Sequence, residues 1–243
     1  INSLALPVSD NEVLHLGRSV TTGKECMPLM VCIGSLIKYL KNRPAKDRDE
    51  KLMILIPKAA GHCRLGQYHV FVNQFIKDSG LKDVALLDLS LDHKFAGMGV
   101  MTLYNAWRAI VVADVIDDIE CSIRALAVDP VKGLSILRAE GEKICDSLEG
   151  KSKKRLYCQL RESAEQLKRI PLKQTLEQSA RIGITGEFFV RRDHFSNLSI
   201  AHRLAEKGFV VSIASLTEVM YYVNFMIKQG IKKPAHTLLS RLE

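Results

Sequence analysis

The chain has 243 residues, of which 47% are hydrophobic and 26% are charged, a balance that is typical of globular proteins and excludes wholesale disorder. Its net charge of +8 is spread thinly, without an arginine-rich arm, so no nucleic-acid partner is expected. No apolar run reaches the roughly eighteen residues that span a bilayer. The six cysteines include no Cys-x-x-Cys pair, which favours reduced thiols and excludes a zinc finger. We therefore expect a soluble, cytoplasmic protein without a membrane partner.

The first residues lack a starting Met, a basic region and an apolar signal core. This beginning predicts a piece of a longer protein, in which function is shared with flanking sequence.

Residues 1–100 are expected to form a first α/β half. A helix is predicted over residues 28–40, and a short apolar run at 52–56, ended by a proline, predicts a strand buried on both faces. Apolar residues at helical spacing from Tyr68 to Ile76 predict a helix, and residues 84–87 predict the next strand. Strand, helix and strand within about forty residues indicate a parallel unit.

Residues 101–178 are expected to be a helical middle, with helices over 101–128, 131–148 and 152–170. Their apolar stripes predict that they pack together. The expected buried residues are Tyr104, Trp107, Leu137, Leu160 and Leu167.

Residues 179–243 are expected to form a second α/β half, with strands at 181–186 and 209–213. Ser215 and Glu218 have the spacing of a capping box at the start of a last helix. The predicted fold class is therefore α/β, with two β-α-β halves of Rossmann-like or flavodoxin-like type separated by the helical segment. We expect two sheets rather than one.

Cys26 and Cys63 are the first candidates for chemistry. Each lies in a glycine-containing loop directly before a predicted helix, where the helix N-terminus favours a thiolate, and Arg64 adds a positive charge beside Cys63. The alternative for both is a half-buried thiol that packs as a small hydrophobic side chain. His62 and His69 flank Cys63 as a possible base or ligand, or as ordinary polar loop residues.

Cys32 lies inside a predicted helix and is expected to be in the core. The other three cysteines are expected to fill the core or the surface: Cys121, Cys145 and Cys158.

Two further groups are weaker candidates. Gly186 ends an incomplete phosphate-loop pattern, and Arg191 and Arg192 precede a predicted helix. These arginines either clamp an anion or are surface residues beside an Asp that caps the helix. The carboxylates at positions 114, 117 and 118 share a helix face, and without a ligand motif we expect a solvated stripe and no structural metal.

Three stretches resemble the 2-hydroxyacyl-CoA dehydratase family, most closely its large activase-related proteins. They are TTGKECMPL at 21–29, followed by GSLIKYL, then GHCRLGQY at 61–68, and GEFFVRRD at 186–193. They occur in family order and cover most of the chain. The second departs from the family's GPCRFGQY at His62, which replaces a proline.

The resemblance implies an oxygen-sensitive [4Fe–4S] module of anaerobic metabolism. In such systems an ATP-hydrolysing activase domain or protein delivers a low-potential electron to a cluster-bearing partner, which acts on an acyl-CoA. Cys26 and Cys63 stand in the matching motifs and are the candidate ligands. The activase's ATPase motifs and any third or fourth motif cysteine are absent from these 243 residues, so the isolated piece is expected to be inactive.

Two other functions compete with this one. One is a non-redox module that binds an acyl-CoA or a nucleotide, with Arg64, Gly186, Arg191 and Arg192 as the candidate binding residues. The other is a thiol enzyme with Cys63 as its nucleophile.

Overall fold

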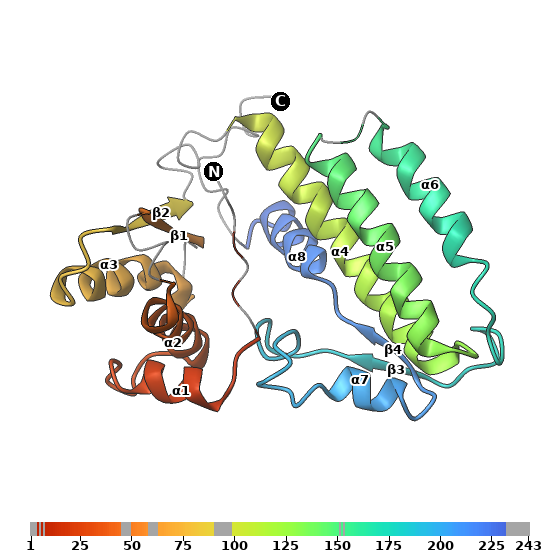
Figure 1. The fold of residues 1–243 in the computed structure, drawn as a ribbon, viewed down its shortest axis with the longest axis horizontal. Coiled ribbons are helices and arrows are strands. Elements are labelled where there is room, and N and C mark those ends of the chain that lie inside the picture. The colour runs from red at the N-terminus through yellow and green to blue at the C-terminus, as the bar shows by residue number, and fades with distance from the viewer. Residues whose placement is uncertain are drawn as a thin grey trace. The chain divides into compact units, whose positions relative to one another are not determined.

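The structure is a computed structural model that describes residues 4, 6, 8–44, 50–57, 63–89, 99–150, 152 and 154–231. These residues fall into two compact units, one up to residue 89 and one from residue 99 on, and each has its own hydrophobic core. Helices and two short parallel strand pairs alternate along the chain (Figure 1). The chain is therefore a mixed α/β protein.

The first unit combines helices with one parallel strand pair. Its elements are α1 (Asn11–Arg18), α2 (Met27–Asn42), β1 (Leu52–Pro57), the short 3-10 helix η2 (Arg64–Gln67), α3 (Tyr68–Asp78) and β2 (Val84–Leu89). Strands β1 and β2 are parallel, with Ile54 opposite Leu86. Gly80 adopts a left-handed conformation (φ 64°) after α3 and turns the chain back toward β2.

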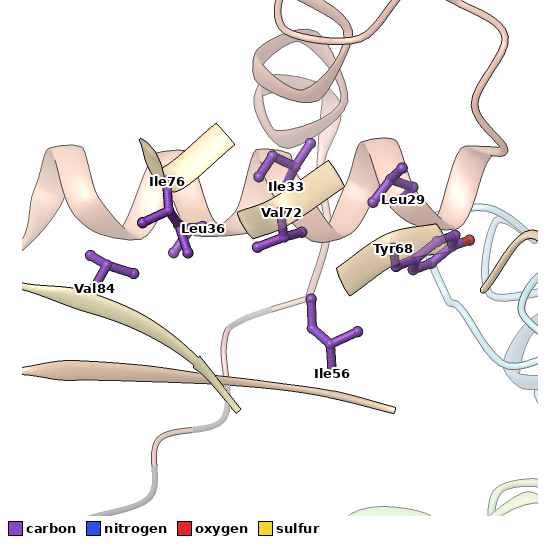
Figure 2. Close-up of a cluster of buried hydrophobic side chains, with 8 residues drawn as sticks. All are labelled: Leu29, Ile33, Leu36, Ile56, Tyr68, Val72, Ile76 and Val84. Carbon is purple, nitrogen blue, oxygen red and sulfur yellow. The ribbon is translucent and has the colours of Figure 1, made fainter. Parts of the chain in front are cut away.

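The core of this unit lies between the two long helices and one face of the strand pair. Figure 2 shows Ile33 of α2 and Val72 of α3 in the same cluster as Ile56 of β1 and Val84 of β2. Ile33 and Val72 are only 1% and 2% exposed. The cluster fixes α2 and α3 on the strands, and with them the two helix starts that follow the motif cysteines.

The apolar run of β1 predicted a strand that is buried on both faces, and this prediction is wrong. The side chains of Met53 and Leu55 point to the face opposite the core and are 58% and 55% exposed. Because successive side chains of a strand alternate between faces, a single packed face leaves half of this apolar run in solvent.

The second unit is built around one long helix. Its elements are α4 (Val100–Leu126), α5 (Pro130–Leu148), α6 (Leu156–Leu167), β3 (Arg181–Ile184), α7 (Ile200–Ala205), β4 (Val210–Ile213) and α8 (Leu216–Lys228). Helix α5 lies between α4 and α6 (Figure 1), while β4, α7 and α8 pack on α4. The helical middle and the second strand pair thus form one compact unit.

The predicted strands and helices of this unit are present with small shifts at their ends. Strands β3 and β4 are parallel, with Arg181 opposite Val210. Helix α5 begins after Asp129, whose carboxylate accepts a hydrogen bond from the Lys132 amide at 3.0 Å. Helix α8 begins after Ser215, whose hydroxyl accepts a hydrogen bond from the Glu218 amide at 3.1 Å, which is one of the two hydrogen bonds of a capping box.

Burial within the helical middle differs in part from the prediction. Leu137 is buried, whereas Trp107, Leu160 and Leu167 are half-buried. The prediction for Tyr104 is wrong, because its side chain is 51% exposed.

The inner face of α6 is partly polar. Ser163 donates a hydrogen bond of 2.7 Å to the buried carboxylate of Glu140 on α5, and Gln159 donates to Ser163 at 3.0 Å. Polar side chains that hydrogen-bond to one another are therefore buried between α5 and α6, where an apolar stripe was expected.

Candidate functional site

Cys26 lies directly before α2, at the end of a tight turn. Gly23 adopts a left-handed conformation (φ 82°), and the Glu25 carboxylate accepts a hydrogen bond from the Thr22 amide at 2.9 Å. Pro28 occupies the first turn of the helix, where no amide donor is needed. This turn holds the Cys26 side chain half-buried at the helix N-terminus.

Cys63 directly precedes η2, which leads without a break into α3. Its thiol is exposed. It follows the carboxyl end of β1, the edge of a parallel sheet at which ligands commonly bind. His62 lies outside the described residues, and His69 is half-buried on α3.

Two contacts tie the Cys26 loop to the Cys63 segment. Arg64 donates a hydrogen bond of 2.7 Å from Nη1 to the carbonyl oxygen of Lys24. The Cys26 sulfur lies 2.6 Å from the hydroxyl oxygen of Tyr68, the first residue of α3. Segments about forty positions apart in the sequence are therefore joined at the starts of α2 and α3.

Tyr68, expected on the apolar face of a helix and at the end of the second motif stretch, contacts a candidate ligand. Its side chain is 6% exposed. Burial raises the pKa of its phenol, and so do the hydrogen bond with Cys26 and the charges of Cys26, Cys32 and Cys63.

Cys32 differs from its expected place in the core, because its side chain is exposed. Surrounding protein nevertheless raises the pKa of its thiol, and the Cys26 charge adds to this effect. An exposed side chain and a raised thiol pKa are compatible, since a thiol at a protein surface can contact water on one side and protein on the other.

The donor set for metal is incomplete in the described residues. A [4Fe–4S] cluster normally takes four thiolates, and the two tied segments supply Cys26 and Cys63. Nowhere in the described part of the chain do three or more His, Cys, Asp or Glu side chains gather as a metal-binding group. The described residues therefore provide no complete set of cluster ligands, and Cys26 and Cys63 stay predicted ligands.

In the second unit, Arg191 and Arg192 follow the turn that begins at Gly186. Arg191 is 8% exposed and donates to the carbonyl oxygens of Ser215 (3.0 Å) and Gly186 (3.4 Å). Its guanidinium also lies 5.8 Å from the ring centre of Phe188. These contacts fasten the turn after β3 to the residue that caps α8.

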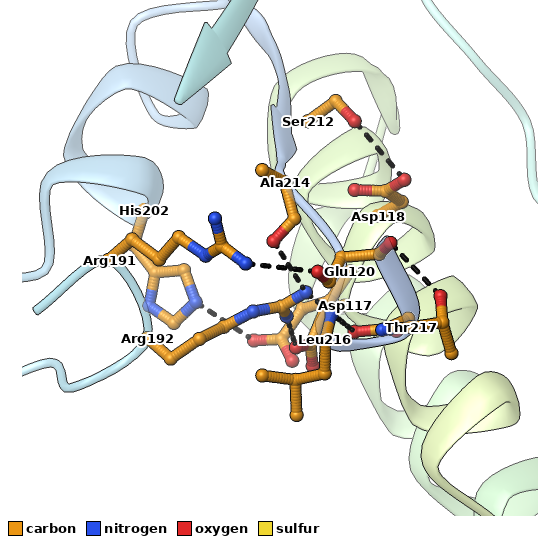
Figure 3. A network of polar contacts seen from close by, with 12 residues as sticks. Asp117, Asp118, Glu120, Arg191, Arg192, His202, Ser212, Ala214, Leu216 and Thr217 are labelled. Carbon is orange, nitrogen blue, oxygen red and sulfur yellow. Dashed lines mark hydrogen bonds and ion pairs between the residues drawn. The ribbon is translucent and has the colours of Figure 1, made fainter. Parts of the chain in front are cut away.

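Arg192 takes part in a network of ion pairs on α4 (Figure 3). It donates to Asp114 at 2.7 Å and also pairs with Asp117. Asp114 in turn accepts hydrogen bonds from the amides of Leu216 (2.9 Å) and Thr217 (3.1 Å) at the start of α8. The outer nitrogens of both arginines thus bind protein groups, and the Nε atom of each is buried without a partner in the described residues.

The prediction of a solvated stripe of carboxylates on α4 is wrong for Asp114, because this residue is only 7% exposed. Burial raises the pKa of Asp117, although the charge of Arg192 opposes this effect. Asp118 accepts from the Ser212 hydroxyl at 3.3 Å. Three neighbouring carboxylates therefore differ in burial and in partners.

Glu120, one turn further along α4, pairs with Arg124 at 2.6 Å and lies 3.4 Å from His202. The ring of His202 lies 4.6 Å from that of His194. Burial lowers the pKa of His202, and Arg124 adds to this effect.

Two cavities of about 610 Å³ lie elsewhere in the second unit. One is lined by the end of α4, the start of α5 and the turn before β4, and the other by α5 and the segment after α6. None of the predicted site residues lines either cavity.

No protein-family model, curated protein or solved structure matches the chain. Among the described helices, none combines the length and the apolar character that crossing a membrane requires.

Proposed function

We propose that the chain is an iron–sulfur redox module related to the 2-hydroxyacyl-CoA dehydratases and their activases. The observation that carries the proposal is the joining of two motif segments, through Arg64 with Lys24 and Tyr68 with Cys26. Both segments contain the cysteines that the resemblance marks as ligands. A cluster site built from segments distant in sequence needs such ties to hold its sulfurs in place.

In this proposal Cys26 and Cys63 hold the cluster, and its other ligands come from outside the described residues. When bound, the cluster would accept and pass on single electrons at low potential. Arg64 would hold the Cys63 segment against the Cys26 turn. The electron donor would be an ATP-hydrolysing activase domain or protein, in the cytoplasm, and the two strand pairs would belong to Rossmann-like halves.

Iron and sulfide analysis tests this proposal. The full chain is purified and reconstituted without oxygen, together with Cys26→Ser, Cys63→Ser and the control Cys145→Ser, whose thiol is exposed on α5. We expect iron, sulfide and visible absorbance in the wild type and in the control, and loss of all three in the two motif variants. A wild-type chain that takes up no iron, or a Cys145→Ser variant that loses it, contradicts the proposal.

A non-redox module that binds an acyl-CoA or a nucleotide is the second candidate. The shortage of metal ligands in the described residues favours it over the cluster, because two thiolates alone do not complete a cluster. Calorimetric titration with CoA and with ATP distinguishes the two functions. Binding of either by an iron-free chain, with loss of affinity in Arg64→Ala, favours this second function.

A further inference from the structure

The Lys207 cavity, named for a lysine in the turn before β4, lies in the second unit where α5 begins. Its volume of about 610 Å³ is within the range of about 300–1,000 Å³ that small-molecule sites occupy. Its lining comes from the end of α4, the start of α5, the segment after α6 and the turn before β4. Helix α5 and strand β4 both pack on α4, so the walls of this cavity belong to one packed unit.

One wall of the Lys207 cavity is apolar. Leu126 at the end of α4 is only 1% exposed and belongs to a buried cluster, and Leu134 of α5 packs against a neighbouring cluster. Pro130 and Val131 extend this wall at the first turn of α5, and Val131 is 80% exposed. A ligand with an apolar body would remove this surface from water, which favours binding.

Positive charge lies around the apolar wall. Lys173 and Lys207 are exposed lining residues from two different segments, and neither forms an ion pair with a described residue. Arg124 also lines the cavity, but it pairs with Glu120 at 2.6 Å. Glu206 is the only acidic residue in the lining. The two lysines outweigh this glutamate, and the N-terminus of α5 adds a partial positive charge, so the cavity favours an anion.

We propose that the Lys207 cavity binds a small organic anion, namely a carboxylate with an apolar body. The carboxylate accepts hydrogen bonds from the ammonium groups of Lys173 and Lys207, which are donors only. The apolar body lies on Leu134 and Val131 of α5. Exposed ion pairs each contribute little to affinity, so the apolar wall provides most of it and the lysines select the sign of the charge. The site uses neither motif cysteine and none of the candidate binding arginines.

Nuclear magnetic resonance titration of the full, iron-free chain with octanoate tests this inference, and 1-octanol serves as a neutral probe of equal chain length. The backbone amide signals of Val131, Lys173 and Lys207 should shift together as octanoate is added. We expect octanoate to bind about fivefold more tightly than 1-octanol, because only the anion forms the two exposed ion pairs. An absence of shifts at these amides, or equal affinities for the two probes, overturns the inference.

Charge variants at exposed positions distinguish this site from a general effect of net charge. The double variant Lys173→Gln/Lys207→Gln should bind octanoate about fivefold more weakly, and Glu206→Gln should bind it about twofold more tightly. The matched control is Lys132→Gln/Lys168→Gln, which removes the same charge from two residues outside the lining of the Lys207 cavity. It should keep the wild-type affinity.

Because Lys132 lines the other cavity, the control also shows which cavity octanoate occupies. Circular dichroism checks that each variant keeps its helices. Wild-type affinity in Lys173→Gln/Lys207→Gln, or an equal loss of affinity in the control, overturns the inference.

Discussion

The buried carboxylate of Asp114 is stabilised from two directions. Arg192 pairs with it from the segment after β3, and two amides at the start of α8 donate to it. A buried charge is costly unless it is paired and hydrogen-bonded, and the N-terminus of a helix also favours a negative charge. This one side chain therefore connects α4 to two later segments of the same unit.

The partners of Asp114 explain why its burial could not be predicted from the sequence. Arg192 and Leu216 lie 78 and 102 positions away along the chain. The spacing of the carboxylates on α4 indicates that they share a helix face, but it gives no information on whether that face is buried. Which face meets another segment depends on tertiary packing.

Cys121 gives a prediction for alkaline pH. Its thiol is 2% exposed on α4, and burial together with the neighbouring Glu120, Asp117 and Asp118 raises its pKa from 9.0 to about 11. Between these values the unfolded chain releases the thiol proton while the folded protein keeps it. The free energy of unfolding should therefore fall as pH rises from 9 to 11, by at most about 1.4 kcal/mol per pH unit from this group.

Urea unfolding followed by Trp107 fluorescence at about pH 8 and about pH 10 measures this effect. The comparison is with Cys121→Ala, which has no thiol to titrate. The variant should be less stable at both pH values because of its cavity, but it should lose less stability than the wild type on going to higher pH. Equal losses in the two proteins would show that the thiol does not contribute.

Two glycines of α5 differ in their surroundings and offer a test of helix packing. A Cβ atom at Gly133 would lie 2.7 Å from Cγ2 of Ile123, whereas one at Gly141 would meet nothing within 4 Å. Gly133→Ala should therefore destabilise the second unit by about 1–3 kcal/mol, because a branched side chain of α4 must shift. Gly141→Ala should stabilise it by about 0.5–1 kcal/mol, since alanine favours a helix.

Urea unfolding followed by Trp107 fluorescence measures both glycine variants. Stabilisation by both substitutions would mean that α5 does not pack closely on α4 at Gly133.

The strands and most helices of both units could be predicted from the sequence, because apolar runs and helical spacing depend on neighbouring residues. The positions of β2 and β4 and the start of α8 at Ser215 are examples. Burial was less predictable. The apolar run of β1 matches a strand with two covered faces, yet Met53 and Leu55 are exposed.

The candidate site was also predictable only in part. Cys26 and Cys63 were identified from their loops and from the resemblance, whereas Tyr68, although it ends the second motif stretch, was expected on the apolar face of a helix without a site role. A buried tyrosine needs a partner for its hydroxyl, and that requirement is the signal in the sequence for a polar contact at this position. The sequence does not contain the identity of the partner, because Cys26 lies 42 positions away.

Each of the two units has a core made from its own residues. In the second unit Ile123, Leu137 and Ile170 form one cluster, and Cys121, Ala201 and Val211 form another. A segment with its own core can fold by itself. Residues 99–231 should therefore fold when produced alone, although the sequence predicts a domain boundary inside them, at residue 178.

The fragment of residues 99–231 also separates fold from function. We expect a helical circular dichroism spectrum and a cooperative urea transition of Trp107 fluorescence, because its helices pack mainly on one another. It contains three cysteines (Cys121, Cys145 and Cys158) but neither motif cysteine, so it should take up no iron under the conditions that load the full chain. A fragment that binds iron as the full chain does would move the cluster away from Cys26 and Cys63. A fragment without a cooperative transition would show that the core of this unit depends on the rest of the chain.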